Sequence, residues 1–184
     1  AAHAEVAQSF GLPTWGLAGA TDAKRLDAQA GIESAFHVLA QGLAGINLIH
    51  DVGYMDMGMA CSAEMLVMGD EVVAMARRFI EGIKVDSETL ARDVIAEVGA
   101  GGHYLQTDHT YDHFRQELWR PSLLTRQPRD EWEMAGGQDM VQRVQAKTQA
   151  IAAEHQPKTL PETTLATLDQ LKRQGEKELI ALEQ

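Results

Sequence analysis

The sequence predicts an α/β fold in which a short parallel sheet is followed by several helices. Two apolar runs, 12–18 and 46–49, each end in a polar loop, as buried parallel strands do. Residues 28–44 between them have helical periodicity, with apolar side chains on one face at Ile32, Phe36, Leu39 and Leu43. Because a strand, a helix and a strand joined by short links form a βαβ unit, the two strands are predicted to be parallel.

Helical patterns cover most of the remaining chain. The sequence does not begin with Met, and its first residues already have a helical pattern. We interpret this start as a processed N-terminus or a fragment. Helices are expected at 1–10, 62–81, 87–98 (capped by Asp86 or Ser87), 108–119, 138–154 and 161–183. No third strand is evident, and two parallel strands alone would leave their edges unpaired. We therefore expect the chain to be one piece of a larger α/β structure.

Composition excludes several classes of protein. The 184 residues include 16 Lys+Arg and 27 Asp+Glu, a net charge of −11, and such an acidic chain repels nucleic-acid phosphates. No apolar run reaches the roughly 20 residues that a membrane-spanning helix needs, and no secretory signal is evident. The single cysteine, Cys61, cannot form an internal disulfide, which favours the cytoplasm.

Two groups of polar residues follow the predicted strands, where α/β folds place their functional side chains. The first is Gly19, Thr21, Asp22 and Lys24, and the second is His50, Asp51 and Tyr54. The structural alternative for Asp22 is a cap for the following turn. For His50 and Asp51 it is a hydrogen-bonded pair that closes the strand.

A third polar group follows the glycine-rich stretch 99–102, which allows the chain to turn sharply. It contains His103, Tyr104 and His109, with His113 one helical turn beyond His109. Two histidines four residues apart can share a metal ion. However, the glutamate of the His-Glu-x-x-His motif is absent, so His103 and His109 fit better as polar groups that line a pocket.

Six of the eight methionines lie between positions 55 and 75. Met65, Met68 and Met75 are expected in a helix core, whereas Met55, Met57 and Met59 are expected in a loop that could contact a partner or cofactor. Trp15, Tyr54 and Tyr104 lie near the polar groups, and aromatic faces attract quaternary ammonium ions. Core packing is the alternative for each. Cys61 has no evident base, so a catalytic thiol is not expected.

Four segments together carry a resemblance to a known family: LPTWGLAGATDAK (12–24), DAQAGIE (27–33), NLIHDVGY (47–54) and FRQELWRP (114–121). They resemble the trimethylamine methyltransferase (MttB) family, and the likeness extends from about residue 5 to residue 180. The resemblance implies the C-terminal part of a TIM barrel. Residues 1–105 would form the last βα units, and 106–184 a helical segment packed on the barrel.

The resemblance also implies methyl transfer from a methylated amine to the Co(I) corrinoid of a separate corrinoid protein. Trimethylamine enzymes of the family use pyrrolysine, whereas relatives without it include glycine betaine enzymes; all residues here are standard. For such a reaction, their positions in the sequence lead us to expect that Asp22, His50 and Asp51 are catalytic and that His103 and His109 bind the corrinoid. The expected amine contacts are Trp15, Thr21, Tyr54 and Tyr104.

We further expect a homo-oligomer, no protein-bound metal and no tightly held cofactor in this chain. Two other functions remain open from the sequence. The chain could be a non-catalytic helical interaction or regulatory module derived from the same fold. It could also be a metal hydrolase that uses His109 and His113.

Overall fold

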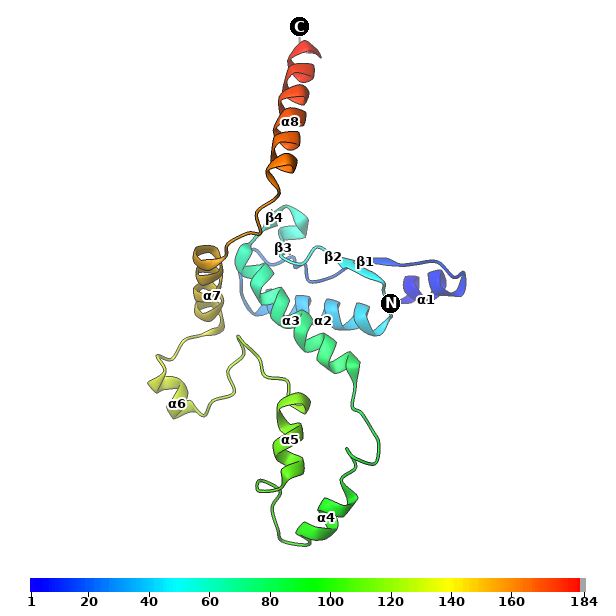
Figure 1. Cartoon of the computed structure of the whole chain (residues 1–184), viewed down its shortest axis with the longest axis vertical. Helices are drawn as coiled ribbons and strands as arrows, with labels where there is room; N and C mark the ends of the chain where they lie inside the picture. The colour runs from blue at the N-terminus through cyan, green and yellow to red at the C-terminus, as the bar shows by residue number, and fades with distance from the viewer. Residues whose placement is uncertain (183–184) are drawn as a thin grey trace. The chain divides into compact units, whose positions relative to one another are not determined.

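The computed structural model describes residues 1–182 and divides into two compact units, Ala1–Ala150 and the residues from Ile151 onward. The first unit contains most of the elements in Figure 1. They are α1 (Ala2–Ser9), β1 (Trp15–Leu17), α2 (Ala28–Leu43), β2 (Leu48–His50), β3 (Tyr54–Met55), the 3-10 turn η1 (Asp56–Gly58), β4 (Ala60–Cys61), α3 (Ala63–Glu81), α4 (Arg92–Val98), α5 (Asp108–Glu117), α6 (Arg129–Met134) and most of α7 (Met140–Glu154). The second unit contains the end of α7 and α8 (Glu162–Leu182).

The predicted parallel strand pair is confirmed. Strand β1 pairs with β2 in parallel, with Trp15 opposite Leu48 and Leu17 opposite His50. Because side chains alternate along a strand, Trp15, Leu17, Leu48 and His50 belong to one face of this two-stranded sheet. Trp15 is 70% exposed and Leu48 is 56% exposed, so no helix of the first unit covers this face.

Helices α2 and α3 cover the other face of the sheet, as Figure 1 shows. Each helix begins at a capping side chain: Asp27 accepts hydrogen bonds from two amides of α2, and Ser62 accepts one from Met65. The apolar core between sheet and helices consists of Ala18, Val38, Val72 and Ala76, with Ile49 packed against it. This βαβ unit fixes where the carboxyl ends of both strands lie.

The buried side of α2 differs from its most apolar side. Ala30, Ser34 and Val38 are buried, whereas Ile32 and Phe36 of the apolar stripe are about 70% exposed (69% and 70%). Small side chains face α3 because they let the two helices approach closely. Periodicity therefore predicted the helix correctly, but Ile32, Phe36 and Leu43 of its apolar stripe are mostly exposed, and only Leu39 of the stripe packs against the core described here.

Two short elements escaped the sequence prediction, namely helix α6 and an antiparallel hairpin formed by β3 and β4. Met55, expected in a loop, is buried in β3, whereas Met57 and Met59 are exposed as expected. Asp56, Met57 and Gly58 all have positive φ angles in the turn between the strands. Strands of two residues are too short to produce an alternating pattern.

Helix α4 begins at Arg92 and not at residue 87 as predicted. The Asp86 carboxylate accepts hydrogen bonds from the amides of Glu88 and Thr89, so Asp86 caps a separate turn. Ala91 then adopts a left-handed conformation, with φ of 46°, which interrupts any helix between the turn and Arg92.

A second core joins α3 to the segment that follows α5. Leu123 and Val144 are buried against Met65 and Met68, which confirms the core position of these two methionines. Beside them, the buried Glu71 carboxylate accepts four hydrogen bonds, two from Ser122 and one each from the amides of Leu123 and Leu124. Burial raises the pKa of Glu71, but these hydrogen bonds outweigh it and hold the pKa below its ordinary value.

The second unit is described by itself. Within Glu162–Ile180 of helix α8 every residue is exposed except Gly175, which is half-buried. No helix within residues 1–182 combines the length and the apolar character that crossing a bilayer requires. The proposed division of the chain at 105/106 stays a prediction.

Candidate functional site

The loops that follow β1 and β2 are tied together by backbone hydrogen bonds. The Ala18 amide donates to the His50 carbonyl at 3.1 Å, and the Thr21 amide donates to the Tyr54 carbonyl at 3.0 Å. The amide of Asp56 in the hairpin donates to the Ala23 carbonyl at 3.3 Å. The carboxyl ends of the two strands and the hairpin therefore form one continuous rim.

This rim surrounds a cavity of about 370 Å³. Four of the predicted site residues line it, namely Thr21, Asp22, Asp51 and Tyr54. The remaining lining residues come from β1, its loop, α2 and the hairpin: Leu17, Ala20, Glu33, His37, Met57 and Gly58. The rule that function lies beyond the strand ends thus identified residues that the fold brings together.

Glu33 organises the first loop, although the sequence did not single it out as a site residue. Its carboxylate accepts hydrogen bonds from the Thr21 hydroxyl at 2.6 Å, the Asp22 amide at 2.9 Å and the Gln29 side chain at 2.8 Å. These donors, led by Thr21, hold the pKa of Glu33 below its ordinary value. The signal that could have revealed Glu33 is its spacing of four residues from Gln29, which puts both polar side chains on one helix face.

His50 and Asp51 form a hydrogen-bonded pair, with His50 Nδ1 lying 2.7 Å from Asp51 Oδ1. Asp51 lines the cavity, whereas His50 does not. The His50 ring packs edge-on against Trp15, with 5.1 Å between the ring centroids. Asp51 has a φ of 72°, a conformation that costs energy for a residue with a side chain. The strained backbone and the histidine together fix where the Asp51 carboxylate lies.

The cavity is electrostatically negative. Asp22, Glu33 and Asp51 line it, whereas no lysine or arginine in the described part of the chain does. Lys24 lies beside the cavity: its ammonium group donates to the Asp22 carbonyl at 2.7 Å and pairs with the Asp56 carboxylate at 3.1 Å. A recess lined by carboxylates attracts a cation, and the Tyr54 ring adds an aromatic face that suits an alkylated ammonium group.

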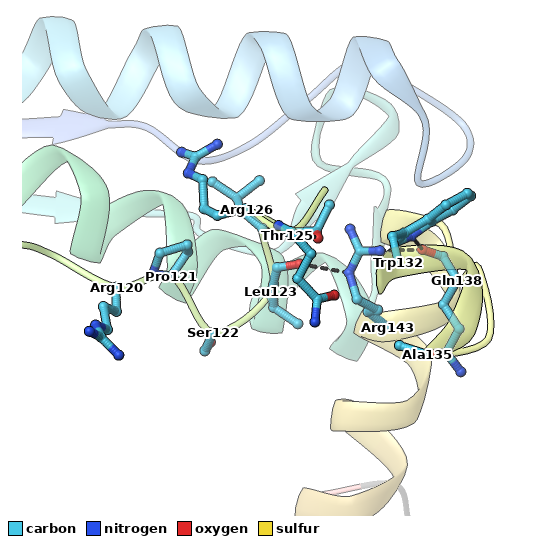
Figure 2. A pocket seen from close by; sticks show the side chains of 12 residues that line it. Arg120, Pro121, Ser122, Leu123, Thr125, Arg126, Trp132, Ala135, Gln138 and Arg143 are labelled. Atoms are coloured by element: carbon cyan, nitrogen blue, oxygen red, sulfur yellow. Dashed lines mark hydrogen bonds between the residues drawn. The ribbon is translucent and has the colours of Figure 1, made fainter. Parts of the chain in front are cut away.

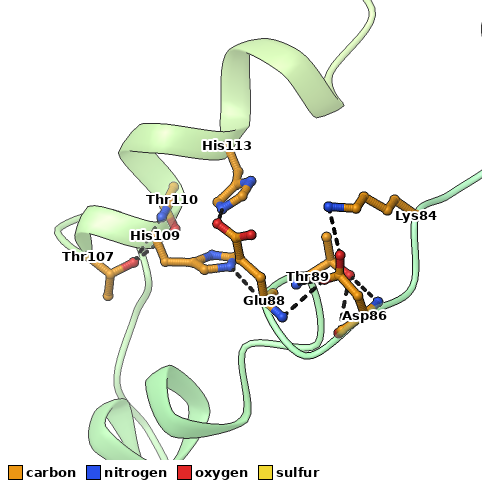
Figure 3. A network of polar contacts seen from close by, with 8 residues as sticks. All are labelled: Lys84, Asp86, Glu88, Thr89, Thr107, His109, Thr110 and His113. Atoms are coloured by element: carbon orange, nitrogen blue, oxygen red, sulfur yellow. Dashed lines mark hydrogen bonds and ion pairs between the residues drawn. The ribbon is translucent and has the colours of Figure 1, made fainter.

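The predicted residues His103, Tyr104 and His109 do not line this cavity. His109 belongs to the network of Figure 3, in which its Nε2–H donates to the Glu88 carbonyl at 2.9 Å. His113 lies 3.4 Å from the Glu88 carboxylate, and the two histidine rings are 4.3 Å apart. His103 and Tyr104 are exposed in the connection between α4 and α5. The predicted roles of these residues stay predictions.

Figure 3 also shows what holds the turn that His109 contacts. The Lys84 ammonium group lies 2.7 Å from the Asp86 carboxylate. The hydrogen bond between them, together with hydrogen bonds to the backbone and side chain of Thr89, lowers the pKa of Asp86 to about 2. Within residues 1–182, no group of three or more His, Cys, Asp or Glu side chains is arranged to hold a metal ion. His109 and His113 therefore have no third metal ligand in the described part of the chain.

Comparison with known proteins identifies the family of the chain. The family model for trimethylamine methyltransferase (MTTB) matches residues 1–178. The chain belongs to the trimethylamine methyltransferase family.

Several members of the trimethylamine methyltransferase family are similar to the chain. "Trimethylamine methyltransferase MttB" of Desulfitobacterium hafniense is 36% identical over 95% of this chain and 35% of its own length. "Glycine betaine methyltransferase" of the same species, strain Y51, is 36% identical over 86% of the chain and 33% of its length. "Trimethylamine methyltransferase MttB" of Methanosarcina thermophila is 34% identical over 87% of the chain and 33% of its own length. The chain thus spans about a third of the length of these relatives.

Proposed function

We propose that the chain contributes the amine site of a methyltransferase that moves a methyl group from a methylated amine to the Co(I) corrinoid of a partner protein. The observation that carries this proposal is the acid-lined cavity at the carboxyl ends of β1 and β2. Family membership supports methyl transfer, and relatives named for trimethylamine and for glycine betaine suggest both substrates.

Asp22 and Asp51 contact the ammonium group in this proposal. They reach the cavity from two different strand ends, so a cation between them is held from two sides. His50 keeps the Asp51 carboxylate in place, and Glu33 keeps the loop that carries Asp22 in place. Such positioning aligns the reacting methyl group, which supplies a large part of the rate enhancement in a displacement reaction.

The cavity also has an apolar part. Leu17, Tyr54 and Met57 line the same cavity as the carboxylates. The positive charge of a quaternary amine disappears as its methyl group departs, so very tight binding of the cation would slow the reaction. Two carboxylates that are open to solvent at the rim, together with an aromatic face, bind the cation without enclosing it.

The corrinoid, when its carrier protein docks, supplies the cobalt nucleophile that receives the methyl group. A quaternary amine then leaves as a neutral tertiary amine, so the chain needs no residue to protonate it.

We propose that the uncovered sheet face, which carries Trp15 and Leu48, belongs to a TIM barrel completed by further strands. The cytoplasm and a homo-oligomeric state stay our expectations, the first because Cys61 is the only cysteine.

A direct assay tests this proposal. The protein expressed from its complete reading frame is mixed with a Co(I)-corrinoid protein and either trimethylamine or glycine betaine, and the Co(I) absorption is followed. We expect one of these amines to consume Co(I), and Asp22→Asn and Asp51→Asn each to slow the reaction by roughly tenfold or more. The matched control is Asp70→Asn, an exposed α3 carboxylate that lines none of the cavities described here. A protein with no activity on any methylated amine contradicts the proposal and favours the non-catalytic module.

A further inference from the structure

A second cavity, of about 480 Å³, lies beside the loop that follows α5 (Figure 2). The function proposed above gives no role to the segment 114–121, yet its last two residues, Arg120 and Pro121, line this cavity. Among residues 1–182, three arginines line it, namely Arg120, Arg126 and Arg143, and no carboxylate does. In a chain with a net charge of −11, this is a local reversal of charge.

Arg143 is held in place by neutral groups. Its Nε donates to the Leu123 carbonyl at 2.7 Å, and a second nitrogen donates to the Gln138 carbonyl. Figure 2 shows the Arg143 side chain extending from α7 toward Leu123 of the loop and Gln138 of the turn before α7. Carbonyl oxygens do not neutralise a guanidinium ion, so Arg143 keeps its positive charge and has further N–H donors.

The walls of this cavity are preformed. The Trp132 indole donates to the same Gln138 carbonyl at 2.9 Å, which fixes the plane of its ring. On the other side, Glu71 accepts hydrogen bonds from the amides of Ser122, Leu123 and Leu124, so the loop cannot easily shift. A ligand that enters therefore meets groups that are already in position, which reduces the entropy cost of binding.

Arg120 and Arg126 add charge without a counterion. Among residues 1–182 neither forms an ion pair, although the Arg120 guanidinium lies 5.8 Å from the centre of the Phe114 ring. Both side chains extend from the loop in Figure 2, at separate points along it. They can turn toward a bound anion, whereas Arg143 is fixed.

We propose that this cavity binds a small phosphate-bearing molecule. A phosphate group carries about −1.5 to −2 charges and several acceptor oxygens, which matches three guanidinium groups better than a single carboxylate does. The volume lies within the range of about 300 to 1,000 Å³ that is usual for small-molecule sites. This inference is independent of the amine site, because the two cavities share no residue.

Calorimetric titration of the protein expressed from its complete reading frame with inorganic pyrophosphate tests the inference. We expect saturable binding of one pyrophosphate, at least tenfold tighter than that of malonate, a dicarboxylate. Arg120→Gln and Arg126→Gln should each weaken binding by roughly threefold to tenfold. Neither side chain makes a hydrogen bond or an ion pair within the described fold, so both variants should fold, which circular dichroism verifies.

The matched control is Arg77→Gln, which removes one exposed positive charge from α3 outside the cavity. Unchanged pyrophosphate binding by Arg77→Gln, with weakened binding by both cavity variants, supports the site. Three results would overturn it: no binding by the unmodified chain, equal weakening by Arg77→Gln, or malonate binding as tight as that of pyrophosphate.

Discussion

The Glu33 carboxylate lies 2.6 Å from the Thr21 hydroxyl, and this contact links helix α2 to the loop that carries Asp22. The same carboxylate oxygen accepts a hydrogen bond from the Asp22 amide at 2.9 Å. One side chain thus holds the polar loop at the end of β1 in a single position. If Asp22 contacts substrate, Glu33 is the residue that positions it.

Loss of the Glu33 charge should loosen this loop. In Glu33→Gln the Thr21 hydroxyl and the Asp22 amide lose a charged acceptor. We therefore expect the amide hydrogen of Asp22 to exchange with solvent roughly tenfold faster. Hydrogen-exchange measurement by NMR checks this. The control is Glu64→Gln, which removes a carboxylate bonded to Ser62 and should leave Asp22 exchange unchanged. Equal exchange rates in the Glu33 variant and the unmodified chain would contradict the assigned role.

Glu33 should also make stability depend on pH in one direction. Its pKa in the folded chain is lowered from 4.5 by hydrogen bonds, first from Thr21. Its contribution to stability is therefore complete above the unfolded pKa and is lost as the pH falls through the folded value. Titration of the carboxyl carbon by NMR should give a pKa below 4.5 in the unmodified chain and a higher one in Thr21→Val. A pKa that does not respond to Thr21→Val would be inconsistent with this hydrogen bond.

Glu71 should be the more important carboxylate for stability. It is only 5% exposed and accepts four hydrogen bonds from the loop 122–124. We expect Glu71→Gln to lower the free energy of unfolding by about 2 to 4 kcal/mol, because an amide cannot accept all four. Urea denaturation measures this. Glu81→Gln, which affects an exposed carboxylate 3.8 Å from Arg78, should change it by less than about 0.5 kcal/mol. The assignment fails if both variants unfold at the same urea concentration.

Substitution of two glycines by alanine should change the stability of the fold in opposite directions. Gly19 has a φ of +79°, and an added Cβ would lie 2.9 Å from a methyl group of Val52, so Gly19→Ala should destabilise the chain by about 1 to 3 kcal/mol. Gly31 lies inside α2 with nothing within 4 Å of an added Cβ. Gly31→Ala should therefore stabilise the chain by about 0.5 to 1 kcal/mol. Thermal unfolding compares them, and a Gly19→Ala variant as stable as the original would refute the close packing against Val52.

Periodicity and strand-end position predicted the features that depend on local sequence. The parallel pair, helix α2 and the shared location of Asp22 and Asp51 followed from apolar runs that end in polar loops. The hairpin around Met57 depends on three consecutive positive φ angles, which no side-chain pattern encodes. Glu33 and Glu71 accept hydrogen bonds from loop residues that are 11 and 51 positions away in the sequence, so only the folded chain reveals these partners.

The exposed face of α2 illustrates the same limit. The apolar residues Ile32 and Phe36 correctly marked a helix, but the helix packs through the smaller Ala30 and Ser34. A periodic pattern identifies an apolar face without identifying what covers it.

The central claim is that the cavity between Asp22 and Asp51 binds a methylated ammonium cation. The most direct measurement compares glycine betaine with 3,3-dimethylbutanoate, in which carbon replaces the charged nitrogen and the shape is kept. By calorimetry on the protein from its complete reading frame, we predict that glycine betaine binds at least roughly tenfold tighter, and that this preference falls in Asp22→Asn and Asp51→Asn. Equal affinity for the two compounds, or a preference that neither substitution changes, would contradict the claim.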